Sequence, residues 1–251
     1  MKKIVFIIAF FLSSSFLFAE DNATLLSNAN KEYSTGQYNN AIELYQKIIK
    51  SGYASFDLYY NLASSYFKVN NYPSSILFYE KANKLKPNDE NVNYNLKVVN
   101  NKIVDKIEAV PDFFLKRWWN SLVNFFPSNT WAVLCIISFF IFFIIAAVYL
   151  LANSVFYRKS AFYLGIFSFF FTLFFFAMAG QQKDFAGSNS EAIIFNPTVS
   201  VKSSPDENST DIFVIHEGTK VKVTDDIGDW YEIKIANGSV GWMKSAGLEK
   251  I

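Results

Sequence analysis

Two long apolar stretches stand out in the middle of a chain that otherwise alternates between polar and apolar positions. They cover residues 131–152 and 161–180, and neither contains a charged side chain. At about 1.5 Å rise per residue the first forms a helix of roughly 33 Å, enough to cross a bilayer core of about 30 Å, and the second is just long enough. The pattern predicts two transmembrane helices joined by a short turn at 153–160, which returns the chain to the side where it started. The export signal described below predicts that this turn is cytoplasmic.

Before this hairpin, residues 22–110 repeat themselves at a spacing of 34 residues. Ala29 recurs as Ala63, and Tyr45 recurs as Tyr79. Small residues at fixed positions with aromatics between them are typical of paired antiparallel helices that stack as a solenoid. The repeat therefore predicts an all-α region in front of the hairpin.

The end of this region has apolar residues at steps of three or four. These are Val92, Leu96, Val99, Ile103 and Ile107. Such spacing predicts one long amphipathic helix that caps the stack. Because about three repeats are usually needed for a stable solenoid, we expect this short stack to depend on a partner or on the membrane.

The repeat resembles the tetratricopeptide repeat (TPR) family through residues 36–38 with 41–45, and again through residues 75–82 before Pro87. This resemblance implies a concave groove lined by the first helix of each pair. The partner-binding candidates at the matching positions are Asn30, Tyr33, Ser34, Tyr60, Ser64, Phe67 and Lys68. Tyr33 and Phe67 are equally explained as internal packing, since aromatic side chains serve both uses.

Residues 111–127, just before the first apolar stretch, form a third kind of pattern. Apolar residues share one helical face and polar residues another. The apolar set is Phe114, Trp118, Leu122 and Phe125, and the polar set is Lys116, Asn120 and Asn124. Trp and basic residues next to a membrane span favour a juxtamembrane helix in the headgroup layer. A helix packed on the solenoid is the alternative.

After the hairpin, over residues 188–251, the apolar period changes to two. Val221 and Val223 alternate with lysines, and Tyr231 and Ile233 alternate with polar residues. Turn residues occur at 225–228 and 236–239, and an Asn-Gly pair between alternating strands is a strong hairpin signal. This pattern predicts a small antiparallel all-β barrel.

The tail resembles the bacterial SH3-like family. The motifs are residues 199–202 and 217–221, Gly228-Asp229-Trp230, Gly241-Trp242-Met243 and Leu248. The resemblance implies a module that binds peptides or cell-wall glycopeptide. Trp230 lies on the opposite face from Tyr231, so it is either an exposed binding platform or a cover for the end of the barrel, because large aromatics are seldom fully buried.

The N-terminus predicts export. Lys2 and Lys3 precede an apolar run, and Ala19 comes just before the first acidic residue. This order is typical of a secretory signal at 1–19, which is either cleaved after Ala19 or kept as an anchor. Basic residues lie both outside the hairpin, at Lys116, Arg117 and Lys183, and in its turn, at Arg158 and Lys159. Their count therefore does not show which end of the hairpin is cytoplasmic. The signal therefore predicts a bacterial inner-membrane protein whose N- and C-terminal domains are both periplasmic.

Composition argues against several classes of function. The 23 basic and 22 acidic residues give a net charge of +1, so no basic field attracts nucleic acid. His216 and Cys135 are the only residues of their types, and Cys135 lies within the first apolar stretch, so neither a Cys-His hydrolase nor a typical zinc site can form. We expect no catalytic residues, no metal and no cofactor.

The order of these parts resembles the BatE family of the Bacteroides aerotolerance operon. That resemblance implies partners among other Bat proteins, which carry von Willebrand factor A domains, and an associated MoxR-type ATPase. The sequence thus predicts a multidomain membrane protein with a TPR solenoid, a transmembrane hairpin and an SH3-like barrel. We expect a scaffold that contacts proteins and membrane lipids; the alternative is a wall-sensing or signal-relay protein whose barrel binds peptidoglycan.

Overall fold

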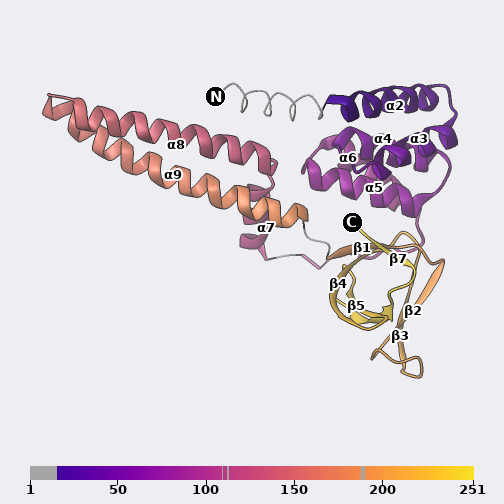
Figure 1. Ribbon diagram of the computed structural model, residues 1–251. Helices are drawn as coiled ribbons and strands as arrows, with labels where there is room; N and C mark the ends of the chain where they lie inside the picture. Colours follow the sequence, from indigo (N-terminus) through magenta and orange to yellow (C-terminus); the bar gives the residue numbers. More distant parts are fainter. Residues whose placement is uncertain (1–15, 109, 112, 188–189) are drawn as a thin grey trace. The chain divides into compact units, whose positions relative to one another are not determined.

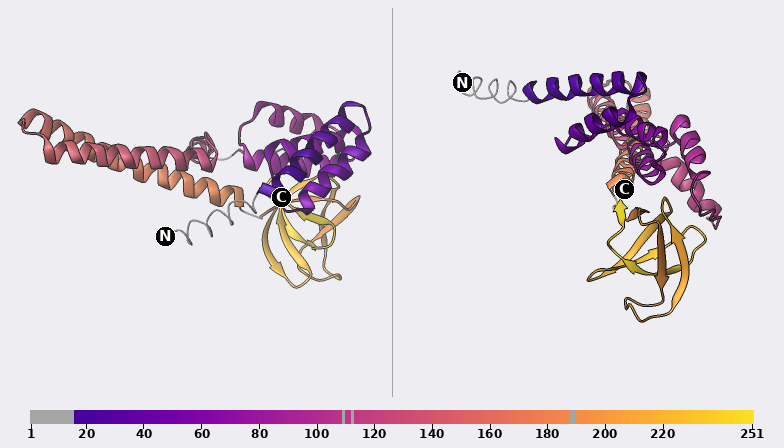
Figure 2. Two further views of the ribbon diagram at one scale, coloured as in Figure 1. Left: turned by 45° about the horizontal axis from the view of Figure 1, so that its top comes forward. Right: turned by 90° about the vertical axis from the view of Figure 1, so that its right-hand side faces the viewer.

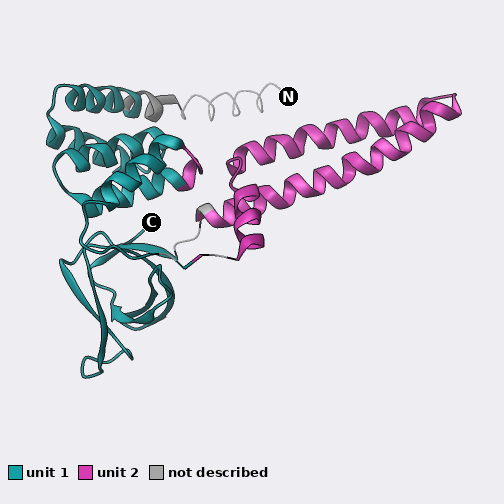
Figure 3. Ribbon diagram, turned by 180° about the vertical axis from the view of Figure 1, so that it is seen from behind, with its two compact units in different colours: residues 1–83, 90–110, 189–251 teal, residues 84–89, 111–188 magenta. Residues whose placement is uncertain are grey.

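The computed structural model describes residues 16–108, 110–111, 113–187 and 190–251, which fall into two compact units (Figure 3). The solenoid–barrel unit combines residues up to 83 with 90–110 and 189–251. The hairpin unit consists of residues 84–89 and 111–188. The basic and apolar part of the predicted export signal lies outside the described residues, and the predicted cleavage point after Ala19 falls within the first described helix.

The solenoid consists of helices that follow the predicted repeat (Figure 1). They are α2 (Phe16–Ser34), α3 (Tyr38–Lys50), α4 (Phe56–Lys68), α5 (Tyr72–Leu85) and α6 (Glu90–Asn100). The small repeat residues are fully buried, which lets neighbouring helices approach closely; they include Ala29, Ala41, Ala63 and Ala82. The helical repeats are therefore confirmed.

The predicted long capping helix is wrong in its second half, because α6 ends at Asn100. Residues 101–108, called the strap below, form a turn and an irregular segment, and residues 103, 105 and 107 are partly buried while their neighbours are exposed. A spacing of four fits an extended chain of period two as well as a helix, which explains the error. Ile103 packs with the solenoid core, whereas Ile107 packs with the barrel core.

The C-terminal region is a curved antiparallel sheet (Figure 2). Its strands are β1 (Glu191–Ile194), β2 (Thr198–Lys202), β3 (Asp211–His216), β4 (Lys220–Ile227), β5 (Trp230–Lys234), β6 (Val240–Lys244) and β7 (Leu248–Lys250). The seven strands lie in the order β3-β2-β6-β5-β4-β1-β7. The predicted all-β fold class is confirmed.

One of the two predicted turns is displaced. Asp225 and Asp226 lie within β4, and Ile227 pairs with Trp230, so the turn consists of the two residues between them. Gly228 supplies the positive φ of 58° that this short turn needs. The other turn lies at 236–239 as predicted, between β5 and β6.

The solenoid and the barrel share a hydrophobic core. Ile193 of β1 and the C-terminal Ile251 are buried in the same cluster as Ile76 and Val99 of the solenoid. This cluster lies at α5 and α6, where a further repeat would otherwise cover the stack. The barrel of the same chain therefore covers part of the solenoid core, and the expected support from a partner or the membrane stays a prediction.

The hairpin unit contains α7 (Phe114–Val123), α8 (Ser128–Leu151) and α9 (Val155–Gly187). By length and composition, α8 and α9 could each cross a membrane. The link between them is shorter than predicted, because α9 begins before Arg158 and Lys159 and includes both. Arg158 lies 5.6 Å from the ring centre of Tyr149, which holds the start of α9 against the end of α8.

Candidate binding sites

The solenoid contains a groove of about 280 Å³ on the face formed by α2, α4 and α6. Its lining residues are Tyr33, Tyr60, Asn61, Ser64, Phe67, Lys68, Tyr79 and Asn95. Most of the predicted partner-binding residues thus come together in one cavity. Asn30 lies beside it, bonded to Asn61, whereas Ser34 is exposed, lines no part of it and donates to the carbonyl of Lys31.

Polar side chains in the groove are held by hydrogen bonds between helices. Asn61 Nδ2 donates to Asn30 Oδ1 at 3.0 Å, and Asn95 Nδ2 donates to the Tyr60 hydroxyl at 3.0 Å. The hydroxyls of Ser64 and Tyr79 lie 2.9 Å apart. An Asn amide has two N–H donors and a carbonyl acceptor, so one internal bond can orient the group for binding a peptide backbone.

Three lining residues were missed by the sequence analysis: Asn61, Tyr79 and Asn95. A signal for them was present, since Asn61 and Asn95 are 34 residues apart and occupy the same repeat position. Tyr79 is on the second helix of its pair, which the family resemblance does not place in the groove. It reaches the cavity because α5 packs against α4, where the Tyr79 ring lies 5.7 Å from that of Tyr60.

The aromatic residues of the groove act both as packing and as lining. The Tyr33 ring lies 5.4 Å from that of Tyr38, and the Phe67 ring lies 6.0 Å from that of Tyr72. Burial raises the pKa of Tyr79 to about 12 and also raises the pKa of Tyr33, so both hydroxyls stay protonated at neutral pH. The groove therefore presents neutral polar groups and aromatic faces, with Lys68 as an exposed cation.

The barrel has a separate cleft of about 390 Å³. Its lining includes Asn196, Thr198, Ser200, Lys202, Glu207, Trp230, Met243 and Lys244. Trp230 is half-buried on the cleft side, whereas Tyr231 and Ile233 pack into the barrel core. Lys244 Nζ lies 5.9 Å from the Trp230 ring centre and pairs with Glu207. The cleft thus combines an aromatic wall with charged groups of both signs.

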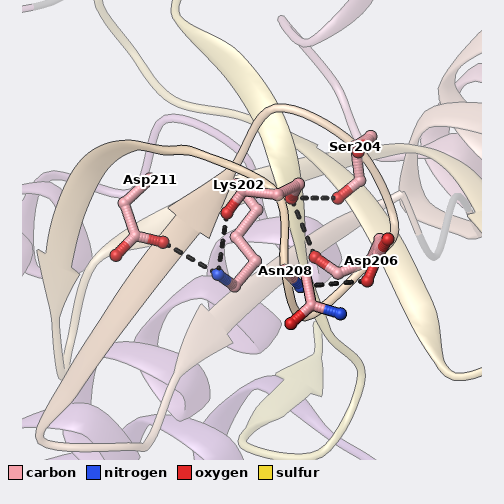
Figure 4. A network of polar contacts seen from close by, with 6 residues as sticks. Lys202, Ser204, Asp206, Asn208 and Asp211 are labelled. Atoms are coloured by element: carbon pink, nitrogen blue, oxygen red, sulfur yellow. Dashed lines mark hydrogen bonds and ion pairs between the residues drawn. The ribbon is translucent and has the colours of Figure 1, made fainter.

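The loop between β2 and β3 brings Glu207 to this cleft. Figure 4 shows how it is held: Lys202 Nζ pairs with Asp211 at 3.0 Å, and the backbone N–H of Asn208 donates to Asp206 at 2.9 Å. The hydrogen bond and charge of Lys244 lower the pKa of Glu207. This polar loop is therefore an organised wall of the cleft.

A third polar cluster, called the clasp below, joins the strap to the barrel. Asp105 accepts hydrogen bonds from the His216 backbone N–H at 2.7 Å and the Thr219 hydroxyl at 2.6 Å, and lies 2.8 Å from His216 Nδ1. Burial alone would raise the pKa of Asp105, but these bonds outweigh it and hold that pKa below 3.8. Within the residues that the structure describes, no group of three or more His, Cys, Asp or Glu is placed to hold a metal ion.

Two family models match these two binding regions. Residues 56–89 match the tetratricopeptide repeat. Residues 197–249 match the bacterial SH3 domain. No curated protein matches the chain. Both matched modules bind other molecules rather than catalyse reactions, and they suggest protein or peptidoglycan binding.

Proposed function

We propose that this chain is a non-enzymatic, membrane-anchored scaffold. The solenoid groove binds an extended segment of one protein partner, the barrel cleft binds a second partner, and α8 with α9 anchors the chain in the bilayer. The observation that carries this proposal is the shared core of Ile193, Ile251 and the solenoid, supported by the clasp. A rigid connection keeps the two sites at a fixed separation.

Such an arrangement strengthens weak contacts. Two partners bound to one body have a high effective concentration for each other, and anchoring confines them further to the membrane surface. The predicted export signal favours the extracytoplasmic face of the bacterial inner membrane for both binding sites. The order of the parts further supports a Bat-type stress or aerotolerance complex, with von Willebrand factor A domain proteins as partners.

Co-purification from native membranes tests the scaffold. We expect Lys68→Glu, which reverses the charge at the groove, to lose partners that the native chain retains. Ser34→Ala is the matched control, since Ser34 lies on α2 outside the groove. Equal recovery with both variants would contradict the assignment of the groove. Reporter fusions at Asn30 and Lys250 test topology, and both should report the exported side.

A second candidate function is wall sensing, favoured by the aromatic wall at Trp230. Aromatic faces beside hydrogen-bonding groups suit sugars and short peptides, which are both parts of peptidoglycan. The test is retention of the detergent-solubilised full chain on purified sacculi. Retention that Trp230→Ala abolishes and Ile227→Ala preserves would support sensing, because Ile227 is exposed on β4 outside the cleft. No retention would leave the scaffold as the function.

A further inference from the structure

The short helix α7 is fixed to the base of the α8–α9 pair. Leu122 and Val123 pack against Trp131 and Met178, and Trp131 Nε1 donates to the Val123 carbonyl at 3.0 Å. On the same side, Trp119 Nε1 donates to Gln181 Oε1 at 2.9 Å. These contacts hold α7 at the end of the pair that is remote from the link at 152–154 (Figure 1).

A second face of α7 is aromatic and open. Phe114 is 61% exposed, Trp118 is 64% exposed, and Phe125 just beyond the helix is 67% exposed. At about 100° per residue, Phe114 and Trp118 share this face, while Asn120 lies on the opposite side. The helix also carries Lys116 and Arg117 and has no acidic residue. This face is therefore apolar, with Arg117 at its margin and Lys116 on the opposite side together with Asn120.

The position of α7 along the helix pair matches the boundary of a bilayer. The 24 residues of α8 span about 36 Å, against a hydrocarbon core of about 30 Å, so each end extends about 3 Å beyond the core. Trp131, which bonds to α7, is three residues into α8 and therefore lies near the edge of the core. Trp and basic side chains favour that depth.

We propose that α7 binds the anionic headgroup layer of the membrane that α8 and α9 cross, with Phe114, Trp118 and Phe125 inserted between lipids. This inference rests on the proposed membrane anchoring. Arg117, at the margin of this face, provides the complementary charge for acidic lipids. In this arrangement α7 lies in the interface, while α8 and α9, to which it is bound, cross the membrane. The position of α7 then fixes the tilt and rotation of the helix pair, and with them the direction in which the chain leaves the membrane.

The test uses the full chain with Cys135→Ser, which removes the only cysteine, reconstituted in vesicles of phosphatidylethanolamine and phosphatidylglycerol. A polarity-sensitive fluorophore is attached to a new cysteine in either Phe114→Cys or Asn120→Cys. We expect a blue-shifted emission at position 114, with several-fold stronger quenching by a lipid-attached quencher than at position 120. Position 120 should instead be quenched by aqueous iodide.

Two further arms separate the alternatives. In phosphatidylcholine vesicles the protection at position 114 should fall, and adding Arg117→Gln should remove the difference between the two lipids. Equal iodide quenching at 114 and 120, or no effect of lipid charge, would overturn the proposal. Protection that disappears on dilution to one chain per vesicle would assign the face to a second copy. A probe at Ile144→Cys, in the middle of α8, reports separately whether the hairpin inserts at all.

Discussion

The carboxylate of Asp105 lies 2.7 Å from the backbone nitrogen of His216, although 111 residues separate the two in the chain. The same carboxylate faces His216 Nδ1 and the Thr219 hydroxyl, so one side chain satisfies several donors in the turn between β3 and β4. Because Asp105 belongs to the strap that leaves the solenoid, the bond joins the two binding modules. Substitutions in the clasp therefore test whether this contact holds the solenoid and the barrel together.

We expect Asp105→Ala to destabilise the solenoid–barrel unit by about 1–3 kcal/mol, because it leaves partly buried donors without an acceptor. Asp105→Asn keeps one acceptor oxygen, so it should lower the free energy of unfolding by less than Asp105→Ala does. Denaturant titration of the detergent-solubilised chain measures the free energy of unfolding, and hydrogen exchange at residues 216–219 locates the effect. Unchanged exchange there in Asp105→Ala would show that the clasp does not hold the turn.

The clasp should also respond to acid. The folded-state pKa of Asp105 is lowered from 3.8, so its stabilising contribution is complete above that value and is lost as the pH falls through the folded-state pKa. The stability difference between the native chain and Asp105→Asn should therefore be constant near neutral pH and shrink below about pH 4. Unfolding titrations at several pH values check this. A difference that grows on acidification would have the wrong sign for a lowered pKa.

The architecture of each module could be predicted from sequence because the residue pattern records local burial. The recurrence of Ala29 as Ala63 identifies helix contacts within the solenoid, and the alternation around Ile233 identifies one face of a strand. The same patterns place several candidate residues in the groove, since residues on one helical face stay neighbours in any stack. Asn61 and Asn95 follow from the same period.

The connection between the modules could not be predicted, because it depends on contacts between residues far apart in the chain. Ile103 and Ile107 fit a helical spacing, yet they pack with two different cores. Ile193 lies in a continuous apolar run with Ala192 and Ile194, all of them buried, and Ile251 follows the last strand. Nothing local shows that these two isoleucines face the solenoid. The sequence argument used His216 only to exclude a Cys-His hydrolase and a typical zinc site. That argument gives no information on its hydrogen bonds to Asp105.

The shared core predicts that a barrel substitution destabilises the solenoid. Ile193→Ala removes a fully buried side chain from the cluster that contains Ile76, and such changes cost about 2–5 kcal/mol. Hydrogen exchange should accelerate in α5 and α6 as well as in β1. Ile227→Ala is the control, because its side chain is 53% exposed on β4, and exposed positions usually change stability by about 0.5 kcal/mol or less. Acceleration confined to the barrel would contradict a common core.

Gly218, in the turn between β3 and β4, packs tightly against Ile103 of the strap. A Cβ there would lie 2.5 Å from Ile103 Cγ2, and φ is +85°. Gly218→Ala should therefore cost about 2–4 kcal/mol, from left-handed strain and from overpacking. Gly228→Ala serves as the matched control, because the φ of Gly228 is also positive, at +58°, but a Cβ added there would meet no neighbouring atom within 4 Å. It should cost only about 1–2 kcal/mol in the same denaturant titration. Equal losses would mean that Ile103 moves aside freely.

The helix pair offers a last test at a polar seam formed by Ser138 of α8 and Ser168 of α9. Ser138 Oγ donates to the Ser168 carbonyl at 3.3 Å, Ser168 Oγ donates to the Ser138 carbonyl at 3.2 Å, and both residues are buried. Small residues at such a seam allow close packing, while one hydrogen bond within a membrane contributes only about 0.6 kcal/mol. The Ser138 hydroxyl also accepts from Thr172 Oγ1 at 3.0 Å, but Thr172 keeps its second bond, to the Ser168 carbonyl. Ser138→Ala should therefore cost only about 1 kcal/mol or less.

Ser138→Leu, in contrast, adds volume between α8 and α9 and should cost about 1–3 kcal/mol by separating the helices. Ile137→Leu is the control on the neighbouring residue, whose side chain is 50% exposed. Titration of the reconstituted chain with a denaturing detergent, followed by energy transfer between labels on the two helices, measures the difference. If Leu at position 138 were as stable as Ala, close packing at the seam would not set the separation of the two helices.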